Sequence, residues 1–195
     1  MSRLKEDIEL IVFDTETTGL DPAHDRVIQI SAIKYKVSGE KLEEVARLNK
    51  FINPGFQISE QIEKLTGITN RKLLGSESEM VIFFKYIYKF FGERPRVAAY
   101  NSSFDIAFLE RMYERYAKKF TPKEDIDVLA LARDLIPKDY IFNFKLETVA
   151  RYLRCNEEGR YHNSMVDTEA TSRVYQKLMQ MRASKEEAGE QMSFL

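Results

Sequence analysis

Residues 8–20 read IELIVFDTETTGL, and this stretch sets both the centre of the fold and the chemistry of the chain. Its first six residues are nearly all apolar, which is typical of a strand buried inside a sheet. Asp14 and Glu16 follow two positions apart, and side chains two apart on a strand point to the same face. Both carboxylates can therefore reach one metal ion. Gly19, in the turn-like segment that follows, allows a close approach between backbone and ligand.

The segments outward from this strand predict a sheet flanked by helices. Residues 27–37 and 42–52 are strand-like and are joined by Ser38-Gly39-Glu40-Lys41, which is typical of a hairpin turn. Shorter strand-like runs are found at 96–100 and 125–127. Helical patterns cover residues 79–91, 104–119, a segment that ends at 135, and residues 145–154 and 164–182. A three-stranded meander followed by alternating strands and helices predicts a mixed sheet in the α/β class.

Size and composition indicate one ordinary domain. The chain has 195 residues, of which 44% are hydrophobic and 31% charged, as in soluble globular proteins. We expect this domain to cover residues 1–182 and to be followed by a flexible polar tail, residues 183–195. The net charge of −1 excludes a global attraction to nucleic acid. Any binding must come from local basic patches, for which the candidates are Arg71, Lys72, Arg151, Arg154 and Arg160.

Cysteine usage and the first residues indicate a cytoplasmic protein. Cys155 is the only cysteine, so no disulfide can form within the chain. The first residues are charged where a signal peptide would be apolar, and no run approaches the ~18 apolar residues of a membrane span. We therefore expect a cytoplasmic location and no membrane contact.

Three more candidate site residues lie far along the chain. Asp105 ends the stretch Asn101-Ser102-Ser103-Phe104-Asp105, where a strand-like run gives way to a helical pattern. His162 and Asp167 stand five positions apart, so they would fall on different sides of a single helix. We therefore expect His162 on a loop and Asp167 in the first turn of the helix that follows.

Each of these residues has an ordinary structural explanation. Asp14 and Glu16 could simply solubilise a strand end, Asp105 would complement a helix dipole, and Ser164-Met165-Val166-Asp167 matches a capping box. Gathered in one place, however, four acids are electrostatically costly, because like charges disfavour ionisation together. Divalent cations offset that cost, and a pair of them is a common apparatus for cutting phosphodiesters. The set therefore predicts a nuclease.

Three motifs together resemble those of the DnaQ-like, or DEDDh, 3′→5′ exonucleases, the family of the epsilon proofreading subunit of bacterial DNA polymerase III. They are Phe-Asp-x-Glu-Thr-Thr-Gly-Leu at 13–20, Asn-x-x-Phe-Asp at 101–105 and His-x-x-x-x-Asp at 162–167. The resemblance covers residues 9–178, and Ser164 departs from the alanine that the family often has there. It implies an RNase H-like fold with a mixed five-stranded sheet and two divalent ions, Mg²⁺ or Mn²⁺.

The resemblance also implies roles for individual residues. The metal ligands would be Asp14, Glu16, Asp105 and Asp167, with one ion helping to generate hydroxide from water and the other stabilising the leaving 3′ oxygen. His162 would be the general base, because an unperturbed histidine has a pKa of about 6.5 and accepts a proton near neutral pH. The residues expected to contact the terminal nucleotide are Thr15, Thr17, Leu20 and Ile68, while Asn101 and Phe104 would shape the site.

The leading hypothesis is a metal-dependent 3′→5′ exonuclease that acts on DNA in proofreading or repair and releases nucleoside 5′-monophosphates. A 3′→5′ exoribonuclease that trims RNA is the nearest alternative, and a non-catalytic module that binds nucleic acid or protein is a more distant one. The ending Gln191-Met192-Ser193-Phe194-Leu195 is similar to the short peptides by which bacterial replication proteins bind the sliding clamp. A DNA polymerase subunit and the clamp are therefore the expected protein partners.

Overall fold

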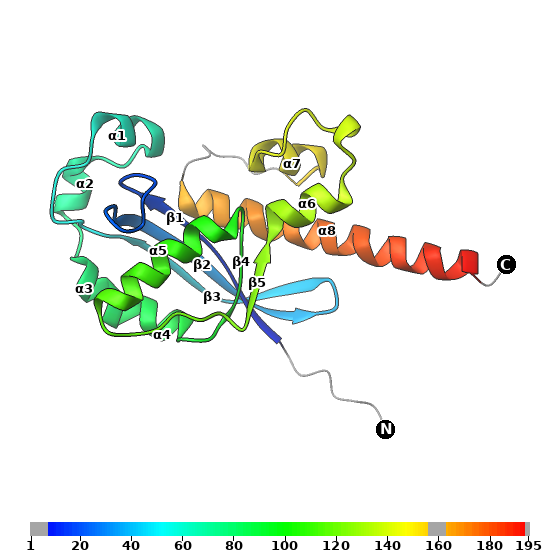
Figure 1. Ribbon diagram of the computed structural model, residues 1–195, viewed down its shortest axis with the longest axis horizontal. Helices are drawn as coiled ribbons and strands as arrows, with labels where there is room; N and C mark the ends of the chain where they lie inside the picture. Colours follow the sequence, from blue (N-terminus) through cyan, green and yellow to red (C-terminus); the bar gives the residue numbers. More distant parts are fainter. Residues whose placement is uncertain (1–7, 156–162, 194–195) are drawn as a thin grey trace, which may run out of the picture.

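A five-stranded mixed sheet forms the centre of the protein (Figure 1). The structure is a computed structural model that describes residues 8–155 and 163–193. Its strands are β1 (Ile8–Thr17), β2 (Val27–Ser38), β3 (Lys41–Phe51), β4 (Arg96–Ala99) and β5 (Glu124–Asp127). They lie in the order β3-β2-β1-β4-β5. The pairs β1–β2 and β2–β3 are antiparallel, whereas β1–β4 and β4–β5 are parallel, so β1 is central and joins the two halves.

Helices cover both faces of this sheet (Figure 1). One face packs against α3 (Glu79–Ile82), the π-helical η1 (Phe83–Ile87), α4 (Tyr88–Phe91) and α5 (Ser102–Arg115). The other face packs against α6 (Val128–Leu135), α7 (Leu146–Tyr152) and α8 (Ser164–Ser193). The remaining elements are α1 (Glu60–Thr66), α2 (Asn70–Leu74) and the 3-10 turn η2 (Lys138–Tyr140). A small third core lies under α2 and the segments that flank α1, and it contains Ile28 of β2.

β1 contributes to both main cores, because successive side chains on a strand point to opposite faces. Phe13 packs in the core beside α5, and Val12 packs in the core beside α6, α7 and α8. Burial on both faces explains why this strand is almost continuously apolar. Asp14 and Glu16 are two and four positions after Val12 on the strand, so their side chains point to the same face as Val12, the face that α8 covers.

The predicted mixed sheet of five strands flanked by helices is confirmed. β1 runs to Thr17, so the apolar run at 8–13 continues as a strand through Asp14 and Glu16, which lie near its end as predicted. The predicted end of the last helix at residue 182 is wrong, because the backbone of α8 is helical to Ser193, and residues 194–195 of the predicted tail lie outside the described residues. The short elements α1, α2 and η2 were not predicted.

The described part of the chain contains no membrane span. Among residues 8–155 and 163–193, none of the helices combines the length and the apolar character needed to cross a bilayer.

Candidate active site

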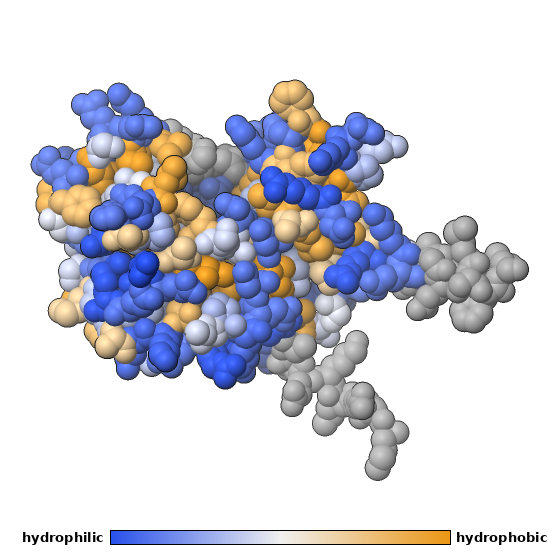
Figure 2. All heavy atoms as spheres, viewed as in Figure 1, coloured by the Kyte–Doolittle hydropathy of each residue, from blue (hydrophilic) through white to orange (hydrophobic). Residues whose placement is uncertain are grey.

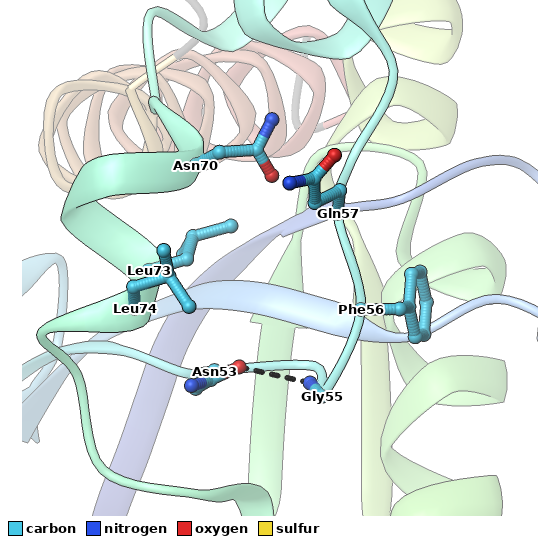
Figure 3. A pocket seen from close by; sticks show the side chains of 7 residues that line it. All are labelled: Asn53, Gly55, Phe56, Gln57, Asn70, Leu73 and Leu74. Carbon is cyan, nitrogen blue, oxygen red and sulfur yellow. Dashed lines mark hydrogen bonds between the residues drawn. The ribbon is translucent and has the colours of Figure 1, made fainter.

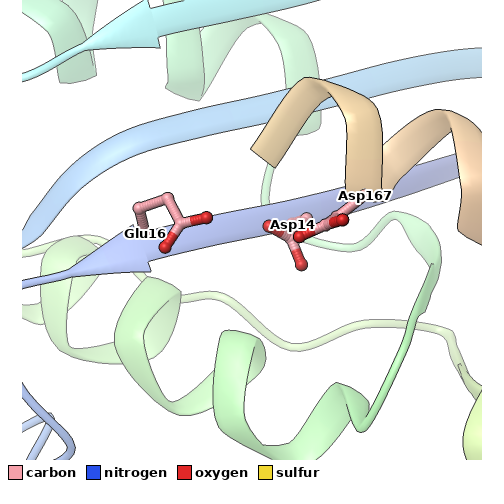
Figure 4. Close-up of side chains that lie close together, drawn as sticks. All are labelled: Asp14, Glu16 and Asp167. Carbon is pink, nitrogen blue, oxygen red and sulfur yellow. The ribbon is translucent and has the colours of Figure 1, made fainter. Parts of the chain in front are cut away.

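Three carboxylates from two distant parts of the chain meet beside β1 (Figure 4). Asp14 and Glu16 project from this strand, and Asp167 projects from the first turn of α8. One carboxylate oxygen of each lies within 4.8 Å of the others. Oxygen donors are the ligands that Mg²⁺ and Mn²⁺ prefer, so this acidic cluster (Asp14, Glu16 and Asp167) can hold a divalent cation.

Asp105 lies beside the acidic cluster and is held against β1 by Thr15. The backbone N–H and the hydroxyl of Thr15 donate hydrogen bonds to Asp105 Oδ1 at 2.9 and 2.7 Å. Asp105 is 3% exposed, and its charge is close enough to Asp14 to repel it. The structure therefore gathers all four predicted acids, with three in mutual reach and the fourth fixed next to them.

Asn101, which has a left-handed backbone conformation, turns the chain so that Asp105 faces the cluster. The chain leaves β4 and turns at Asn101, whose φ of 68° is a conformation that Asn tolerates better than most residues. The backbone N–H of Asn101 lies 3.3 Å from Asp127 Oδ1, the same oxygen that caps the start of α6. The turn is thus tied to the neighbouring helix, and α5 begins with Asp105 in its first turn.

Burial and mutual repulsion raise the pKa of three of these acids. Burial, followed by repulsion from Asp105, Asp167 and Glu16, raises the pKa of Asp14 well above its ordinary value. Burial and repulsion from Asp167 and Asp105 raise the pKa of Glu16 to about 8. Burial raises the pKa of Asp105 to about 7, although the hydrogen bonds from Thr15 oppose this rise. Such acids ionise together only when positive charge is added, so the donor set fits divalent cations.

The start of α8, which places Asp167, is fixed by two serines. The hydroxyls of Ser164 and Ser31 lie 2.6 Å apart in a fully buried contact between α8 and β2. Ser31 is the register partner of Asp14 in the β1–β2 pair. The hydroxyl of Thr168 donates to the carbonyl of Ser164 at 2.6 Å and completes a buried polar contact. The serine that departs from the family pattern therefore pins the helix next to the cluster.

The capping-box explanation of Asp167 is wrong. The helix is capped by Asn163, whose side-chain oxygen accepts a hydrogen bond from the backbone N–H of Met165 at 3.1 Å. Ser164, which would be the cap in that explanation, uses its hydroxyl to contact Ser31 instead. Asp167 thus lies in the first turn as predicted, within reach of Asp14 and Glu16.

Two cavities open on either side of the acidic cluster, and Figure 2 shows the surface hollowed between the α1 and α7 sides. The first, which we call the Glu16 cavity, has a volume of about 460 Å³. The second, the Asp167 cavity, has a volume of about 630 Å³. Both are large enough for a nucleotide-sized group. A chain of nucleotides could therefore occupy both cavities with a phosphodiester at the acids.

A third cavity, of about 240 Å³, shares no lining residue with these two (Figure 3). It lies between α2 and the segment that follows β3, where Asn53 accepts a hydrogen bond from the backbone N–H of Gly55 at 2.9 Å. Its lining consists of amide, apolar and glycine residues, without an acid, histidine or cysteine. It therefore offers no catalytic group.

Comparison with known families gives a direct match. A model of the family RNase_T, described as "Exonuclease", matches residues 11–175. The chain belongs to the RNase_T exonuclease family. The match includes β1, β4, α5 and the first part of α8, the elements that carry the four acids.

Relatives of this exonuclease domain include bacterial polymerases. It is 36% identical over 163 residues to the protein named "DNA polymerase III PolC-type" from Lacticaseibacillus paracasei, and 34% identical over 176 residues to the protein of the same name from Oceanobacillus iheyensis. These matches cover 84% and 90% of this chain but only 11% and 12% of the relatives. The chain thus corresponds to a small part of much longer proteins.

Solved exonuclease structures share the fold. Exonuclease I from E. coli, solved with a dT13 oligonucleotide, matches with a TM-score of 0.75 and 19% identity over 93% of this chain and 43% of that one. The nuclease domain of 3'hExo, described as a DEDDh family member bound to rAMP, matches with a TM-score of 0.71 and 19% identity over 90% of this chain and 94% of that one. The RNase H-like fold and the predicted family are thereby confirmed.

The exonuclease domain distributes the predicted substrate-contacting residues between its two cavities. Thr15, Thr17, Leu20 and Phe104 line the Glu16 cavity. Asn101 lines the Asp167 cavity. Ile68 lines neither cavity and is 5% exposed, because it packs in the small core under α2. Its contact with the terminal nucleotide remains a prediction. His162, the predicted base, lies outside the described residues.

Gly19 also makes room for a neighbouring side chain within the protein. A Cβ at this position would lie 2.4 Å from Asp25 Oδ2, which is closer than atoms can approach. The Asp25 carboxylate accepts hydrogen bonds from the hydroxyl of Thr18 at 2.8 Å and from the backbone N–H of Asp21 at 2.9 Å. Gly19 therefore gives room to a carboxylate that shapes the loop beside the Glu16 cavity. That loop presents Leu20, whose side chain is 84% exposed.

Several residues that line the cavities were missed by sequence reasoning. α1 and its cap supply Ser59, Gln61, Ile62, Leu65 and Thr66 to the Glu16 cavity. Ser59 at the start and Gly67 at the end are ordinary capping residues, and this pair was the signal that could have revealed the helix. The Asp167 cavity takes Arg133 and Lys145, neither of which was among the predicted basic residues. Among the predicted basic residues, Arg151 forms an ion pair with Glu147, with an N···O distance of 2.6 Å.

Without divalent cations, we expect the exonuclease domain to lose stability as pH rises from about 5 to about 8. The raised pKa of Glu16 means that the folded state holds a proton that the unfolded state has already lost, so the stabilisation is complete below the unfolded pKa near 4.5 and is lost on approach to about 8. For one group this amounts to a change on the order of 3 kcal/mol. The measurement is urea unfolding in EDTA across this pH range.

Glu16→Gln should flatten this pH dependence, while Glu110→Gln, at an exposed position on α5, should leave it unchanged. Mg²⁺ or Mn²⁺ should restore stability at the higher pH in the wild type but less in Glu16→Gln. Identical pH slopes for the wild type and Glu16→Gln would contradict the electrostatic description of the cluster.

Proposed function

We propose that this domain is a divalent-metal-dependent exonuclease that removes nucleotides from the 3′ end of DNA and releases nucleoside 5′-monophosphates. The observation that carries the proposal is the acidic cluster of Asp14, Glu16 and Asp167, whose carboxylates lie within 4.8 Å of one another between two nucleotide-sized cavities. A site of this form holds a phosphodiester at the acids and the flanking nucleosides in the cavities. It binds a chain by its end without a large basic surface, which agrees with a net charge of −1.

Asp14, Glu16 and Asp167, with Asp105 beside them, would hold two cations, and an all-oxygen donor set favours Mg²⁺ or Mn²⁺. When bound, these ions supply activation of water and neutralisation of the charge that develops on the leaving oxygen. Thr15 keeps Asp105 in place through its two hydrogen bonds, so the fourth carboxylate is already oriented before any ion arrives. His162 would take the proton of the attacking water, as its motif implies.

The Glu16 cavity supplies the contacts for the terminal nucleoside. Leu20 is 84% exposed at its rim, so its side chain offers an apolar surface to a base. The hydroxyl of Thr17 donates to the carbonyl of Gly19 at 2.6 Å and thereby fixes the loop that carries Leu20. Phe104 and Leu65 add further apolar lining. Backbone contacts and apolar surfaces of this kind bind any base, which suits an enzyme that trims without reading sequence.

The preference for DNA is supported by the names of the relatives, whereas the 3′ end is proposed from the resemblance of the three motifs to the DEDDh exonucleases. The PolC-type relatives are named as DNA polymerases, and E. coli exonuclease I was solved with dT13 and dA16 oligonucleotides. An exoribonuclease that trims RNA from the 3′ end is the second candidate, because the neighbour 3'hExo was solved with rAMP.

The experiment that tests the proposal compares single-stranded DNA and RNA of the same sequence, each labelled at the 5′ end, with Mg²⁺, with Mn²⁺ and with EDTA. We expect a ladder of DNA products shortened from the 3′ end, with nucleoside 5′-monophosphates as the small product, and no cleavage in EDTA. Faster cleavage of RNA would establish the exoribonuclease. Binding without cleavage under all metal conditions would favour a non-catalytic module.

We also propose that the domain acts together with a DNA polymerase, in proofreading or repair, because its relatives carry the corresponding region within PolC-type polymerases. The sliding clamp is the second proposed partner, through Gln191-Met192-Ser193-Phe194-Leu195. The backbone of α8 is helical to Ser193, so this peptide begins at the end of a helix that leads away from the sheet (Figure 1).

A further inference from the structure

The segment between α6 and α7 exposes two aromatic side chains beside the Asp167 cavity. Phe142 is 97% exposed and Tyr140 is 71% exposed, and Phe142 is the most exposed of the large apolar residues in the described part of the chain. Burial of such a ring is favourable, by roughly 25 cal/mol for each Å² removed from water. A single exposed apolar residue needs no explanation by itself, so its surroundings decide what it means.

This exposure belongs to an anchored segment. The hydroxyl of Tyr100 donates to the carbonyl of Phe144 at 2.6 Å, and the side chain of Asn143 accepts from the backbone N–H of Lys145 at 2.9 Å. Ile141 and Phe144 pack against the core that α6, α7 and α8 share with the sheet. Phe142 lies between these two packed residues and faces solvent. The backbone therefore presents the ring at a fixed place on the surface.

The same segment forms a wall of the Asp167 cavity. Phe144 and Lys145 line this cavity together with Arg133 and Asp167 of the acidic cluster. Because consecutive Cα atoms are about 3.8 Å apart, the Cα of Phe142 lies within roughly 7.6 Å of that of Phe144. The exposed ring thus stands next to a channel that reaches the acids. A nucleic-acid strand held at the acids and leaving through this cavity would pass the ring of Phe142.

The charges around the ring favour a polyanion. Arg133, Lys138 and Lys145 are exposed along this part of the chain, two of them in the lining of the cavity, and they outnumber its exposed acids, Asp134 and Asp139, neither of which lines the cavity. The acid Glu147, also in the lining, is paired with Arg151 at 2.6 Å. Cationic side chains interleaved with exposed aromatic rings are the usual platform for single strands, since cations contact phosphates and rings stack on bases of any sequence.

We propose that Phe142, assisted by Tyr140, is a stacking platform for bases of the single-stranded DNA that lies beyond the phosphodiester held at the acidic cluster. This inference rests on the proposed exonuclease function and adds a second binding region to it. The platform would hold the strand while its end is trimmed, so its effect would depend on substrate length. A substrate too short to leave the Glu16 cavity would not reach it.

The test compares two substrates with Phe142→Ala. The p-nitrophenyl ester of thymidine 5′-monophosphate occupies the acidic cluster and the Glu16 cavity, whereas a single-stranded DNA oligonucleotide also crosses the α6–α7 segment. We expect kcat/KM on the oligonucleotide to fall by about 5- to 150-fold, through KM, because this is the range that a base–aromatic stack typically contributes to binding. Hydrolysis of the ester should be unchanged.

Two further substitutions separate stacking from general apolar contact. Phe142→Trp should retain the activity on the oligonucleotide, because the indole ring stacks as well as the phenyl ring. Phe142→Leu should behave like Phe142→Ala, although leucine is equally apolar. The matched control is Phe56→Ala, which removes a half-exposed ring that lines the cavity away from the acids and should leave both substrates unaffected.

The possible outcomes distinguish the platform from the enzyme. If the wild type hydrolyses neither substrate, the proposed function itself fails. If it hydrolyses both and Phe142→Ala leaves the oligonucleotide reaction unchanged, the platform is overturned and the exonuclease stands. An equal loss on both substrates would also overturn it, because the side chain would then act on the catalytic centre rather than on the outgoing strand.

Discussion

Asp14→Asn is expected to lower the exonuclease rate by at least about 10⁴-fold, because the two-metal apparatus that stabilises the transition state is lost. Asp14 lies at the centre of the acids: Asp105, Asp167 and Glu16 all repel its charge. Asparagine keeps the shape of the side chain but removes the negative charge that attracts the cations. The measurement is the release of nucleotides from a labelled single-stranded DNA in Mg²⁺ and in Mn²⁺.

Protein stability must be measured with this variant, because it distinguishes lost chemistry from lost folding. Removal of one of several repelling charges should leave the metal-free protein at least as stable as the wild type. The control is Asp134→Asn, which neutralises an exposed acid on α6 and should retain full activity. Substantial activity in a folded Asp14→Asn protein would show that the reaction does not use this cluster.

His162→Ala is expected to reduce the rate by roughly 10²- to 10⁴-fold, which is the usual contribution of a general base. The four acids are unchanged in this variant, so divalent cations should still raise the unfolding temperature as they do in the wild type. A rate loss with retained metal binding is therefore the expected signature. It would be measured by single-turnover cleavage together with thermal unfolding at several Mn²⁺ concentrations.

The other histidine of the chain is a natural control for this prediction. His24 has a side chain that is 86% exposed, and its Nδ1 lies 2.6 Å from the Asp21 carboxylate in the loop after β1. His24→Ala should leave the rate unchanged. If His162→Ala were as active as His24→Ala, the assignment of the general base would be wrong.

The sheet and the acids could be predicted because their signals are local. An apolar run followed by Asp14 and Glu16 predicts a central strand with two carboxylates on one face. Val12, two positions before Asp14, lies on the same face of the strand and packs in the core beside α6, α7 and α8. The spacing of His162 and Asp167 placed the aspartate in a first helical turn, where it is found. That these separate segments converge could be inferred only from the combined motifs.

Other features depend on contacts that no local pattern encodes. The buried hydroxyl pair of Ser31 and Ser164 joins positions 133 residues apart, so neither serine is recognisable in the sequence as a support of the site. α1 is only 7 residues long and is marked by its caps rather than by periodicity. The packing of Ile68 in the small core under α2 is likewise not marked by any pattern near it in the sequence. Burial of this kind follows from tertiary packing.

The separation of the acids along the chain has a consequence for synthesis. Asp14 leaves the ribosome before Asp167, its partner in the cluster, because Asp167 belongs to α8, the last helix of the described chain. Domains fold as units once their sequence has emerged. A nascent or truncated polypeptide that ends before this helix lacks Asp167 and cannot assemble the acidic cluster. Competence to degrade nucleic acid arrives only with the completed domain.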